Sequence, residues 1–285
     1  MGHIRDRMAD DLVLAGRSES TRTSYLRCAK AFVKHFMRSP EELGEAEVRQ
    51  HLLHLATERK LAVGTRLVYH GAIKFLFAVT LTRPEVVANV PWPRRKRRPP
   101  VVPTRDEVRQ LLATAKAASP YWHAFLLTAY AAGLRRMEVV ALRAEDIDSR
   151  AGLLRVRCGK GDKPRQVMLD PELLTALRAH YKQQGLPGPW LFPAPGSGGW
   201  SDRPISRSAA TAAFRRLARQ AGLREGLTLH KLRHAFATHL LDERLDLVTL
   251  QHLLGHCRIE TTAQYCEVST RRLQAVPSLL EKLRV

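Results

Sequence analysis

A histidine and an arginine stand three residues apart in the stretch LTLHKLRHAFATHLL, residues 227–241. Large apolar residues recur there every three or four positions, which is typical of a helix that buries one face; they are Leu229, Leu232, Phe236 and Leu240. Thr228 can cap the start of this helix. His230 and Arg233 then lie side by side, because residues at i and i+3 are neighbours on a helix surface. Both could reach one ligand, although two solvated polar residues are the simpler interpretation of this stretch alone.

A second candidate pair follows an apolar helix. The segment YWHAFLLTAYAA, residues 121–132, predicts a helix that stops at Gly133, and GLRRMEVVAL comes next. Arg135 therefore emerges at a helix junction. Glu138, three residues further on, could hold its guanidinium in place. The alternative is a surface ion pair of little energetic value.

A lysine stands at the expected turn of a hairpin in LLRVRCGKGDKPRQVMLD, residues 153–170. Alternation predicts one apolar face and one basic face; the apolar face has Leu154, Val156 and Cys158, and the basic face has Arg155 and Arg157. Gly159 and Gly161 make the turn. These glycines would let Lys160 approach a ligand closely, whereas most hairpin turns are simply solvated.

Two further candidates follow a short leucine-rich helix, DLVTLQHLLGH, residues 246–256. Its leucines at 247, 250, 253 and 254 are expected to be buried, and Gly255 is a typical C-terminal stop. His256 comes directly after that stop. A second short helical stretch, IETTAQY, brings Tyr265 nine residues after His256. A lone tyrosine there could be a nucleophile or a core residue.

The charge balance of the whole chain indicates a polyanionic partner. The 285 residues carry a formal net charge of +20, with 36 arginines and 11 lysines. A strongly basic protein suits nucleic acid, and the planar arginine fork fits phosphate well. The alternatives are a membrane-surface protein or an arginine-rich composition inherited from codon usage.

A basic, proline-rich segment divides the chain. Residues 91–104, PWPRRKRRPPVVPT, hold five prolines and five consecutive basic residues. Neither a helix nor a central strand tolerates that density of proline. We predict a linker that crosses a phosphate backbone through Arg94, Arg95, Lys96, Arg97 and Arg98; a solvated hinge is the alternative. Net charge is +4 over residues 1–90, +5 in the linker and +11 over residues 105–285.

The two flanking regions predict different folds. Residues 1–90 show helical patterns at about 4–15, 20–38, 45–59 and 65–80, with Ser18, Ser20 and Gly64 as punctuation. We expect a small four-helix domain there. Residues 105–285 mix helices with the hairpin, and the loop LPGPWLFPAPGSGGW (186–200) has no predicted structure. The fold class is therefore mainly α with a small β-hairpin or sheet in the second domain.

Compartment and redox state follow from what the sequence lacks. It has no run of 18 apolar residues and no apolar signal-peptide core, so we expect a cytoplasmic protein with no membrane partner. Its cysteines form no C-x-x-C pattern, which argues against a zinc site and a disulfide framework. We expect reduced, structural cysteines at positions 28, 158, 257 and 266.

Taken together and in order, these motifs resemble the tyrosine recombinases, the integrase family that includes the Xer and Cre proteins. GLRRMEV resembles the first arginine box, GKGDKPRQV the lysine hairpin, LHKLRHAFATHLL the second box, and LLGHCRIETTAQY the third box with the nucleophile. The resemblance covers nearly the whole chain. It implies an all-helical SAM-like core-binding domain (1–90), the linker (91–104), and an α+β catalytic domain (105–285) whose tail is residues 271–285.

The resemblance also implies a mechanism and a catalytic set. The set is Arg135, Lys160, His230, Arg233, His256 and Tyr265, supported by Glu138. Tyr265 would attack a phosphodiester, Arg135 and Arg233 would stabilise the added charge, His230 would accept the proton, Lys160 would protonate the leaving oxygen, and His256 would donate to a phosphate oxygen. No metal and no cofactor are expected.

The partners implied are double-stranded DNA and three further copies of the chain in a synaptic tetramer. An accessory DNA-bending protein or a partner recombinase is a further partner that the family allows. Three rivals stay open at this point. They are a non-catalytic DNA-binding protein on the same scaffold, a type IB topoisomerase-like enzyme, and a metal-dependent nuclease using Glu145, Asp146 and Asp148.

Overall fold

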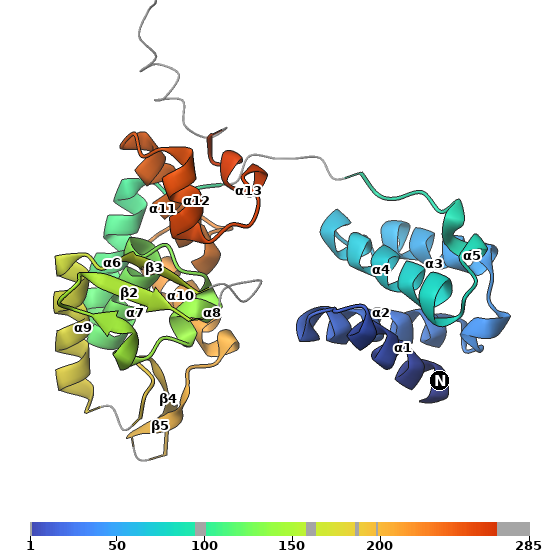
Figure 1. Ribbon diagram of the computed structural model, residues 1–285, viewed down its shortest axis with the longest axis horizontal. Coiled ribbons are helices and arrows are strands. Elements are labelled where there is room, and N and C mark those ends of the chain that lie inside the picture. The colour runs from blue at the N-terminus through green and yellow to red at the C-terminus, as the bar shows by residue number, and fades with distance from the viewer. Residues whose placement is uncertain (1, 95–100, 158–163, 186–187, 198, 267–285) are drawn as a thin grey trace, which may run out of the picture. The chain divides into compact units, whose positions relative to one another are not determined.

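The computed structural model describes residues 2–94, 101–157, 164–185, 188–197 and 199–266 (Figure 1). The chain divides into two compact units, Met1–Arg97 and Arg98–Val285. Its elements confirm the predicted fold class, mainly helical with small antiparallel sheets in the second unit. The linker predicted at 91–104 stays a prediction, since residues 95–100 lie outside the described ones. No helix in the described ranges has the length and apolar character needed to cross a membrane.

The first unit contains the four expected helices, the last of which continues into the π-helical η2, and two short additions. They are α1 (Gly2–Leu14), α2 (Glu19–Phe36), η1 (Pro40–Glu42), α3 (Glu45–Thr57), α4 (Val63–Phe75), the π-helical η2 (Leu76–Thr80) and α5 (Glu85–Ala88). The sequence analysis missed η1 and α5. Ser18 directly precedes α2, whereas the boundaries expected at Ser20 and Gly64 are late by one or two residues, because both residues lie in the first turn of a helix. Gly64 lies in the first turn of α4. The backbone N–H groups of a first turn have no hydrogen-bond partner within the helix, whichever residue type is present.

One apolar face of each long helix forms the core of this unit. Its most deeply buried side chains include Met8, Leu12, Phe32, Val48, Ile73 and Phe77. A histidine, His51, lies among them with 3% of its surface exposed. Neither of its ring nitrogens has a hydrogen-bond partner. Burial, followed by the nearby His35 and His54, lowers the pKa of His51 to about 4.

We expect the first unit to lose stability as the pH falls from 6.5 to 4. Because the pKa of His51 is lowered on folding, the unfolded chain binds the proton more tightly, so the stability is complete above the ordinary pKa and is lost below it. The full loss is about 3 kcal/mol for a change in pKa from 6.5 to about 4. Urea titrations of the whole chain, read by hydrogen exchange of α3, measure it. His51→Leu should flatten this pH dependence, and an equally steep profile in that variant would contradict the assignment.

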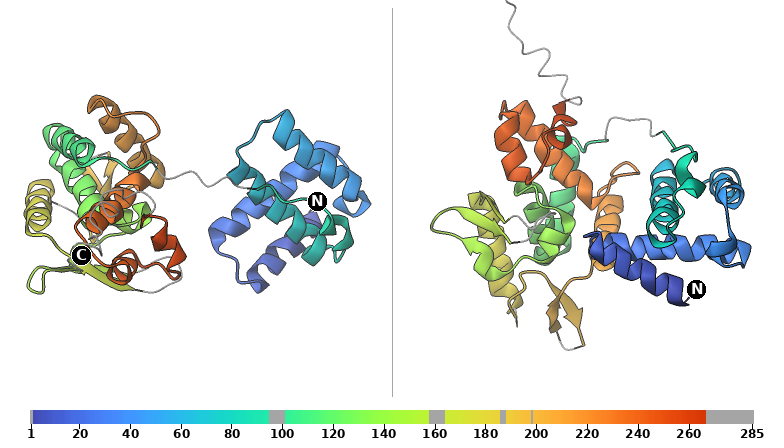
Figure 2. Two further views of the ribbon diagram at one scale, coloured as in Figure 1. Left: turned by 90° about the horizontal axis from the view of Figure 1, so that it is seen from above. Right: turned by 45° about the vertical axis from the view of Figure 1, so that its right-hand side comes forward.

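The second unit is built around one apolar helix, α7. Its elements are α6 (Arg105–Ala118), α7 (Pro120–Ala131), α8 (Arg136–Val140), η3 (Ala144–Asp146), β1 (Ile147–Asp148), β2 (Leu153–Val156), β3 (Arg165–Met168), α9 (Pro171–Gln184), β4 (Pro193–Gly196), β5 (Gly199–Pro204), α10 (Arg207–Gln220), α11 (Leu229–Asp242), α12 (Leu247–Leu254) and α13 (Glu260–Ala263). Helix α7 packs against α6, α8, α9 and α11. Helices α11, α12 and α13 gather at one end of the unit, opposite the β4–β5 pair (Figures 1 and 2).

The predicted hairpin is part of a three-stranded antiparallel sheet of order β1-β2-β3. Leu154 pairs with Val167, and Val156 with Arg165. The side chains of β2 alternate as the sequence predicts, with Leu154 and Val156 buried and Arg155 exposed. Residues 158–163, which include Cys158, Gly159, Lys160 and Gly161, lie outside the described residues.

The segment left without structure in the sequence analysis contains a second hairpin. Strands β4 and β5 pair antiparallel, with Pro195 opposite Trp200. Tyr121 of α7 anchors them, because its hydroxyl donates to the Pro193 carbonyl at 2.9 Å and its ring stacks on Trp200 at 4.8 Å. Prolines are tolerated here because the sheet has only two strands and every strand is an edge. Composition alone therefore concealed this hairpin.

Helix α11 has the predicted apolar face but not the predicted cap. Leu229, Leu232 and Phe236 are buried, and Leu240 is half-buried. Thr228 occupies the N-cap position, yet its side chain accepts no hydrogen bond. The first turn is tight instead, since the backbone N–H of Lys231 donates to the Thr228 carbonyl at 2.7 Å. The expected side-chain cap is therefore wrong.

No disulfide joins the cysteines within the described residues, and these cysteines are not all structural. Cys28 is buried, Cys266 is half-buried and Cys257 is exposed. Cys257 follows the end of α12 directly after His256, where the chain runs along the surface. A structural role was therefore the wrong expectation for this residue.

Candidate active site

A tight turn between α7 and α8 places the first arginine. Helix α7 ends at Ala131, and Gly133 turns the chain with a φ of +58°, a conformation that favours glycine. A Cβ atom at Gly133 would overlap the ring of Phe236 on α11. The turn is thus pressed against α11, and Arg135 emerges at the N-cap of α8 beside Arg233.

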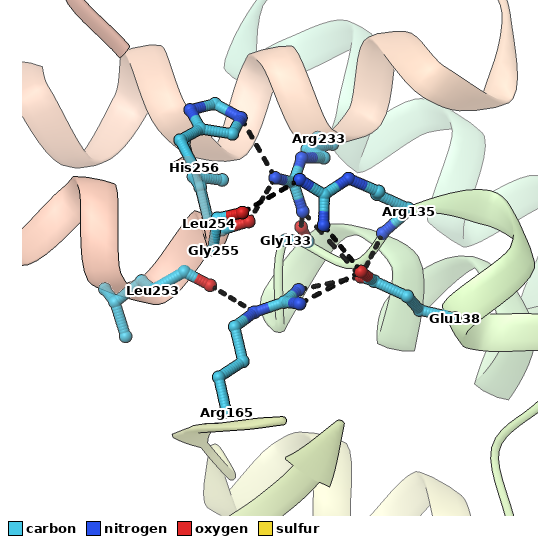
Figure 3. A network of polar contacts seen from close by, with 9 residues as sticks. All are labelled: Gly133, Arg135, Glu138, Arg165, Arg233, Leu253, Leu254, Gly255 and His256. Carbon is cyan, nitrogen blue, oxygen red and sulfur yellow. Dashed lines mark hydrogen bonds and ion pairs between the residues drawn. The ribbon is translucent and has the colours of Figure 1, made fainter. Parts of the chain in front are cut away.

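One buried carboxylate organises three guanidinium groups (Figure 3). The Glu138 side chain is 4% exposed. Arg135 donates to it from Nη1 and from the backbone N, both at 2.8 Å. Arg165 donates to both carboxylate oxygens, at 2.9 and 2.7 Å, and Arg233 Nη1 lies 3.8 Å from Oε2. The predicted pairing of Arg135 with Glu138 is confirmed, and one negative charge faces three positive ones.

The protonation state of Glu138 follows from this setting. Burial alone would raise the pKa of the carboxyl, but the hydrogen bonds and charge of Arg165, then those of Arg135, lower it. The carboxylate is therefore ionised at neutral pH, and the cluster keeps an excess of positive charge. Such an excess in a buried site favours binding of an anion.

The same three arginines satisfy the last carbonyls of α12. Arg165 Nε donates to the Leu253 carbonyl at 2.9 Å, Arg233 donates to the Leu254 carbonyl, and Arg135 Nη2 donates to the Gly255 carbonyl at 3.0 Å. Terminal carbonyls have no intrahelical donor, and cations are favourable at this end of a helix. Gly255 ends α12 with a φ of +59°, as its predicted role as a stop requires.

His256 follows that stop and is held between two partners. Its Nε2 lies 3.1 Å from Arg233 Nη2, and its Nδ1 lies 2.9 Å from the Thr262 hydroxyl. Because a guanidinium only donates, Nε2 is the acceptor and the ring proton is on Nδ1. Burial and then the charges of Arg233 and Arg135 lower the pKa of His256 to about 4. The ring is neutral in this state.

Tyr265 lies against the same cluster, placed by the short helix α13. It is 2% exposed, and its ring stacks parallel to His256 at 6.3 Å and lies 5.3 Å from the ring of His234. Burial raises the pKa of Tyr265, whereas the charges of Arg233 and Arg135 oppose that rise. The hydroxyl is therefore protonated at neutral pH, so a nucleophilic role would require a proton acceptor.

Two histidines of α11 extend from the cluster toward the surface. His230 is exposed, and its ring lies 4.8 Å from that of His234. Desolvation and then the charges of Arg233 and Lys231 lower the pKa of His230. His234 contacts both His230 and Tyr265, and desolvation of its half-buried ring, followed by the charge of His230, lowers its pKa to about 4. The sequence analysis did not single out His234.

Most of the predicted site residues therefore come together. Arg135, Glu138, Arg233, His256 and Tyr265 form one cluster, with His230 at its edge. Lys160 lies outside the described residues, as do Arg95, Lys96, Arg97 and Arg98; Arg94 is described and exposed. Arg165 was missed. The only signal available for it was its place in GKGDKPRQV, five residues after Lys160.

The carboxylates of the nuclease rival are occupied by other contacts. Asp146 is 2% exposed, pairs with Arg157 and accepts the backbone N–H of Arg143. Glu145 also pairs with Arg143 and Arg157, and Asp148 accepts two backbone N–H groups in the next turn. Over the described ranges, no group of three or more His, Cys, Asp or Glu residues is arranged to hold a metal ion. These contacts favour a structural polar loop.

Two family profiles match this chain. The Phage integrase family matches residues 102–272, and the Phage integrase N-terminal SAM-like domain matches residues 4–85. A protein of Sinorhizobium fredii described as an integrase/recombinase is 39% identical over 99% of this chain and 90% of its own length. Tyrosine recombinase XerD of Rhizobium meliloti is 31% identical over 90% of this chain and 88% of its own length.

Solved structures share the fold. The Tn1549 transposon integrase bound to transposon right end DNA has a TM-score of 0.77 at 16% identity, with 99% of both chains covered. A lambda integrase dimer bound to a COC′ core site has a TM-score of 0.74 at 18% identity, covering 92% of this chain and 96% of that one. A lambda integrase tetramer bound to a Holliday junction has a TM-score of 0.73 at 20% identity, covering 93% of this chain and 76% of that one.

Proposed function

This chain belongs to the phage integrase family and is a tyrosine site-specific recombinase, and from that premise we propose that it cuts and rejoins DNA through Tyr265. The observation that carries the proposal is the buried cluster in which this tyrosine lies against the ring of His256 and near Arg135 and Arg233, whose charges give the cluster a positive excess. Phosphoryl transfer requires fixed positive groups around the transferred phosphorus.

In the proposed step the Tyr265 oxygen attacks the scissile phosphorus. A 3′-phosphotyrosyl bond forms, the bond to the 5′ oxygen breaks, and a free 5′ hydroxyl leaves. Arg135 and Arg233 would donate to the non-bridging oxygens, where negative charge develops. Both keep N–H groups beyond those that they use in the cluster, since a guanidinium has five. The new ester conserves the bond energy, so rejoining needs no nucleotide cofactor.

The protons require an acceptor and a donor. We propose His230 as the acceptor for the tyrosine proton, which it could receive directly or through His234, whose ring contacts both. Lys160 would protonate the leaving 5′ oxygen. His256 now accepts a hydrogen bond from Arg233 at Nε2, so it can donate to a phosphate oxygen only when that nitrogen is protonated. A bound phosphate would favour this, because its charge offsets the arginines that lower the pKa of His256.

The described state has to open before it can react. Tyr265 is 2% exposed and Arg233 1%, whereas the Arg135 side chain is 23% exposed. A DNA phosphate can therefore reach Arg135 first, and it reaches the other two groups only after the segment beyond α12 moves. We propose that DNA binding supplies the contacts that stabilise the open arrangement.

The wider assembly belongs to the same proposal. Strand exchange needs four cleaving subunits, so we propose a tetramer acting at a four-way DNA junction in the cytoplasm. The tail at 271–285 would dock on a neighbouring subunit. The basic run at 94–98 would contact DNA phosphates while it joins two domains that bind the same duplex. Both segments lie largely outside the described residues, and these roles rest on charge and apolar pattern.

The test is to trap the covalent complex in EDTA. Nicked duplex fragments spanning the source replicon lose the short strand after cleavage and hold the enzyme on the DNA. We expect an adduct at a defined position, linked at a 3′ phosphate through Tyr265, that forms equally well with EDTA present. Activity that needs added magnesium would overturn the proposal in favour of a nuclease. Relaxation of supercoiled DNA without exchange between two duplexes would favour the topoisomerase-like alternative.

A further inference from the structure

We propose that Arg165 is a positioning residue of the recombinase site, acting as the counterion that keeps Glu138 from drawing Arg135 and Arg233 away from the phosphate. The inference rests on the proposed function of that site. Arg165 is the first residue of β3, in the strand that follows the Lys160 hairpin. No role for it followed from the sequence motifs, and its side chain is 9% exposed.

The contacts of Arg165 are all directed at residues that hold catalytic candidates. Its two terminal nitrogens form a parallel fork with both oxygens of Glu138, at 2.9 and 2.7 Å. Its Nε donates to the Leu253 carbonyl at 2.9 Å. A Cβ atom on Gly255 would lie 3.0 Å from its Cδ, so the side chain also packs against the end of α12. Arg165 thereby links β3 both to Glu138 and to the C-terminal end of α12.

The charges show why a third arginine is needed. Glu138 orients Arg135 through two hydrogen bonds, but as a buried anion it also competes with a phosphate for the same guanidinium. A bidentate fork is the strongest arrangement that a carboxylate makes with arginine. Because Arg165 supplies that fork, the carboxylate is largely neutralised, and Arg135 keeps its orientation while its charge stays available. The charge of Arg233, whose Nη1 lies 3.8 Å from Glu138 Oε2, stays available to a phosphate for the same reason.

The geometry at α12 adds a second effect. Leu253 is three residues before His256, and Arg165 is its only described side-chain donor. Losing that bond frees a terminal carbonyl and loosens the point from which His256 leaves the helix. Within the described part of the chain, the hydrogen bonds of Arg165 go to Glu138 and Leu253 and not to Tyr265 or His256, which is why we assign it a positioning role and not a catalytic one.

The experiment compares Arg165→Met and Arg165→Lys with the wild-type chain on the nicked duplex that yields the wild-type adduct. We expect Arg165→Met to slow single-turnover cleavage about 10- to 100-fold, by analogy with the loss of residues that orient the ligands of a metal site. Arg165→Lys should recover part of that loss, since it keeps the charge without the fork. Arg155→Gln, on the neighbouring strand, is the matched control for loss of one positive charge, because Arg155 is exposed and lies outside the cluster.

A second substrate separates this role from a general loss of structure. A methylphosphonate at the scissile position replaces one charged non-bridging oxygen by a methyl group, so it depends less on free arginine charge. The defect of Arg165→Met should therefore shrink at least several-fold on this substrate. An equal defect on both substrates, or wild-type rates on the phosphodiester, would overturn the proposal. If Arg165→Met does not fold, the same comparison is made with Arg165→Lys. A wild-type chain that forms no adduct would refute the proposed function instead.

Discussion

Replacing Tyr265 by Phe should abolish the covalent protein–DNA adduct and leave DNA affinity unchanged. The substitution removes one oxygen and keeps the ring, which stacks on His256 and packs into the core at the end of the unit. The hydroxyl is buried with 2% of the residue exposed, so its loss changes packing little. Denaturing electrophoresis of the trapped complex and a binding titration on the same nicked duplex measure both quantities.

The matched control for this variant is Tyr130→Phe. Tyr130 also packs against the core at this end of the unit, and its hydroxyl bonds to His239 at 2.9 Å, outside the arginine cluster. That variant loses a partly buried tyrosine hydroxyl but no proposed nucleophile, so its adduct should persist. An adduct of wild-type yield in Tyr265→Phe would remove Tyr265 from its assigned role.

Arg233→Ala should slow single-turnover cleavage by about 100-fold or more. One lost donor to a developing negative charge costs about 3 kcal/mol in comparable sites. The effect should be severe at this position because Arg233 is 1% exposed and also donates hydrogen bonds to the Gly133 carbonyl and to His256. Arg233→Lys should rescue little, since a single ammonium cannot reach both the carbonyl and a phosphate.

Thermal unfolding has to accompany these rates, because the substitution leaves buried carbonyls without donors. A folded Arg233→Lys protein that cleaves at the wild-type rate would exclude the arginine from the site. Arg224→Gln serves as the control: Arg224 is 50% exposed, and it pairs with Glu107 at 2.9 Å away from the cluster. It removes the same charge and should not change the rate of cleavage.

The sequence allowed prediction of the parts of the site whose signals are local. Arg135 and Glu138 are three residues apart, Gly255 is a helix stop, and His230 and Arg233 share a helical turn. Periodicity and turn chemistry act over such spans. For the same reason the hairpin of β2 and β3 and most of the helices could be predicted, whereas the pairing of β1 with β2 could not, and the helix starts expected at residues 20 and 65 are one or two residues late.

The rest could not be predicted because it depends on contacts between distant residues. Arg165 meets Glu138 across 27 positions and Leu253 across 88. Apart from its place five residues after Lys160, nothing in its sequence neighbourhood distinguishes it from the other arginines of a basic chain. His234 is likewise ordinary within its helix, and only the fold brings it to Tyr265. The β4–β5 pair escaped because Tyr121, which anchors it, lies 72 residues earlier.

The span of these contacts has a consequence for the protein during its own synthesis. Arg135 bonds to the Gly255 carbonyl 120 positions later, and Arg233 reaches back 100 positions to Gly133. Translation releases the chain from its N-terminus, and domains fold as they emerge. The first unit can therefore fold while the ribosome still holds α12 and Tyr265. A nascent or prematurely terminated chain has neither the proposed nucleophile nor the carbonyls that orient the arginines, so we expect it to be unable to cut DNA.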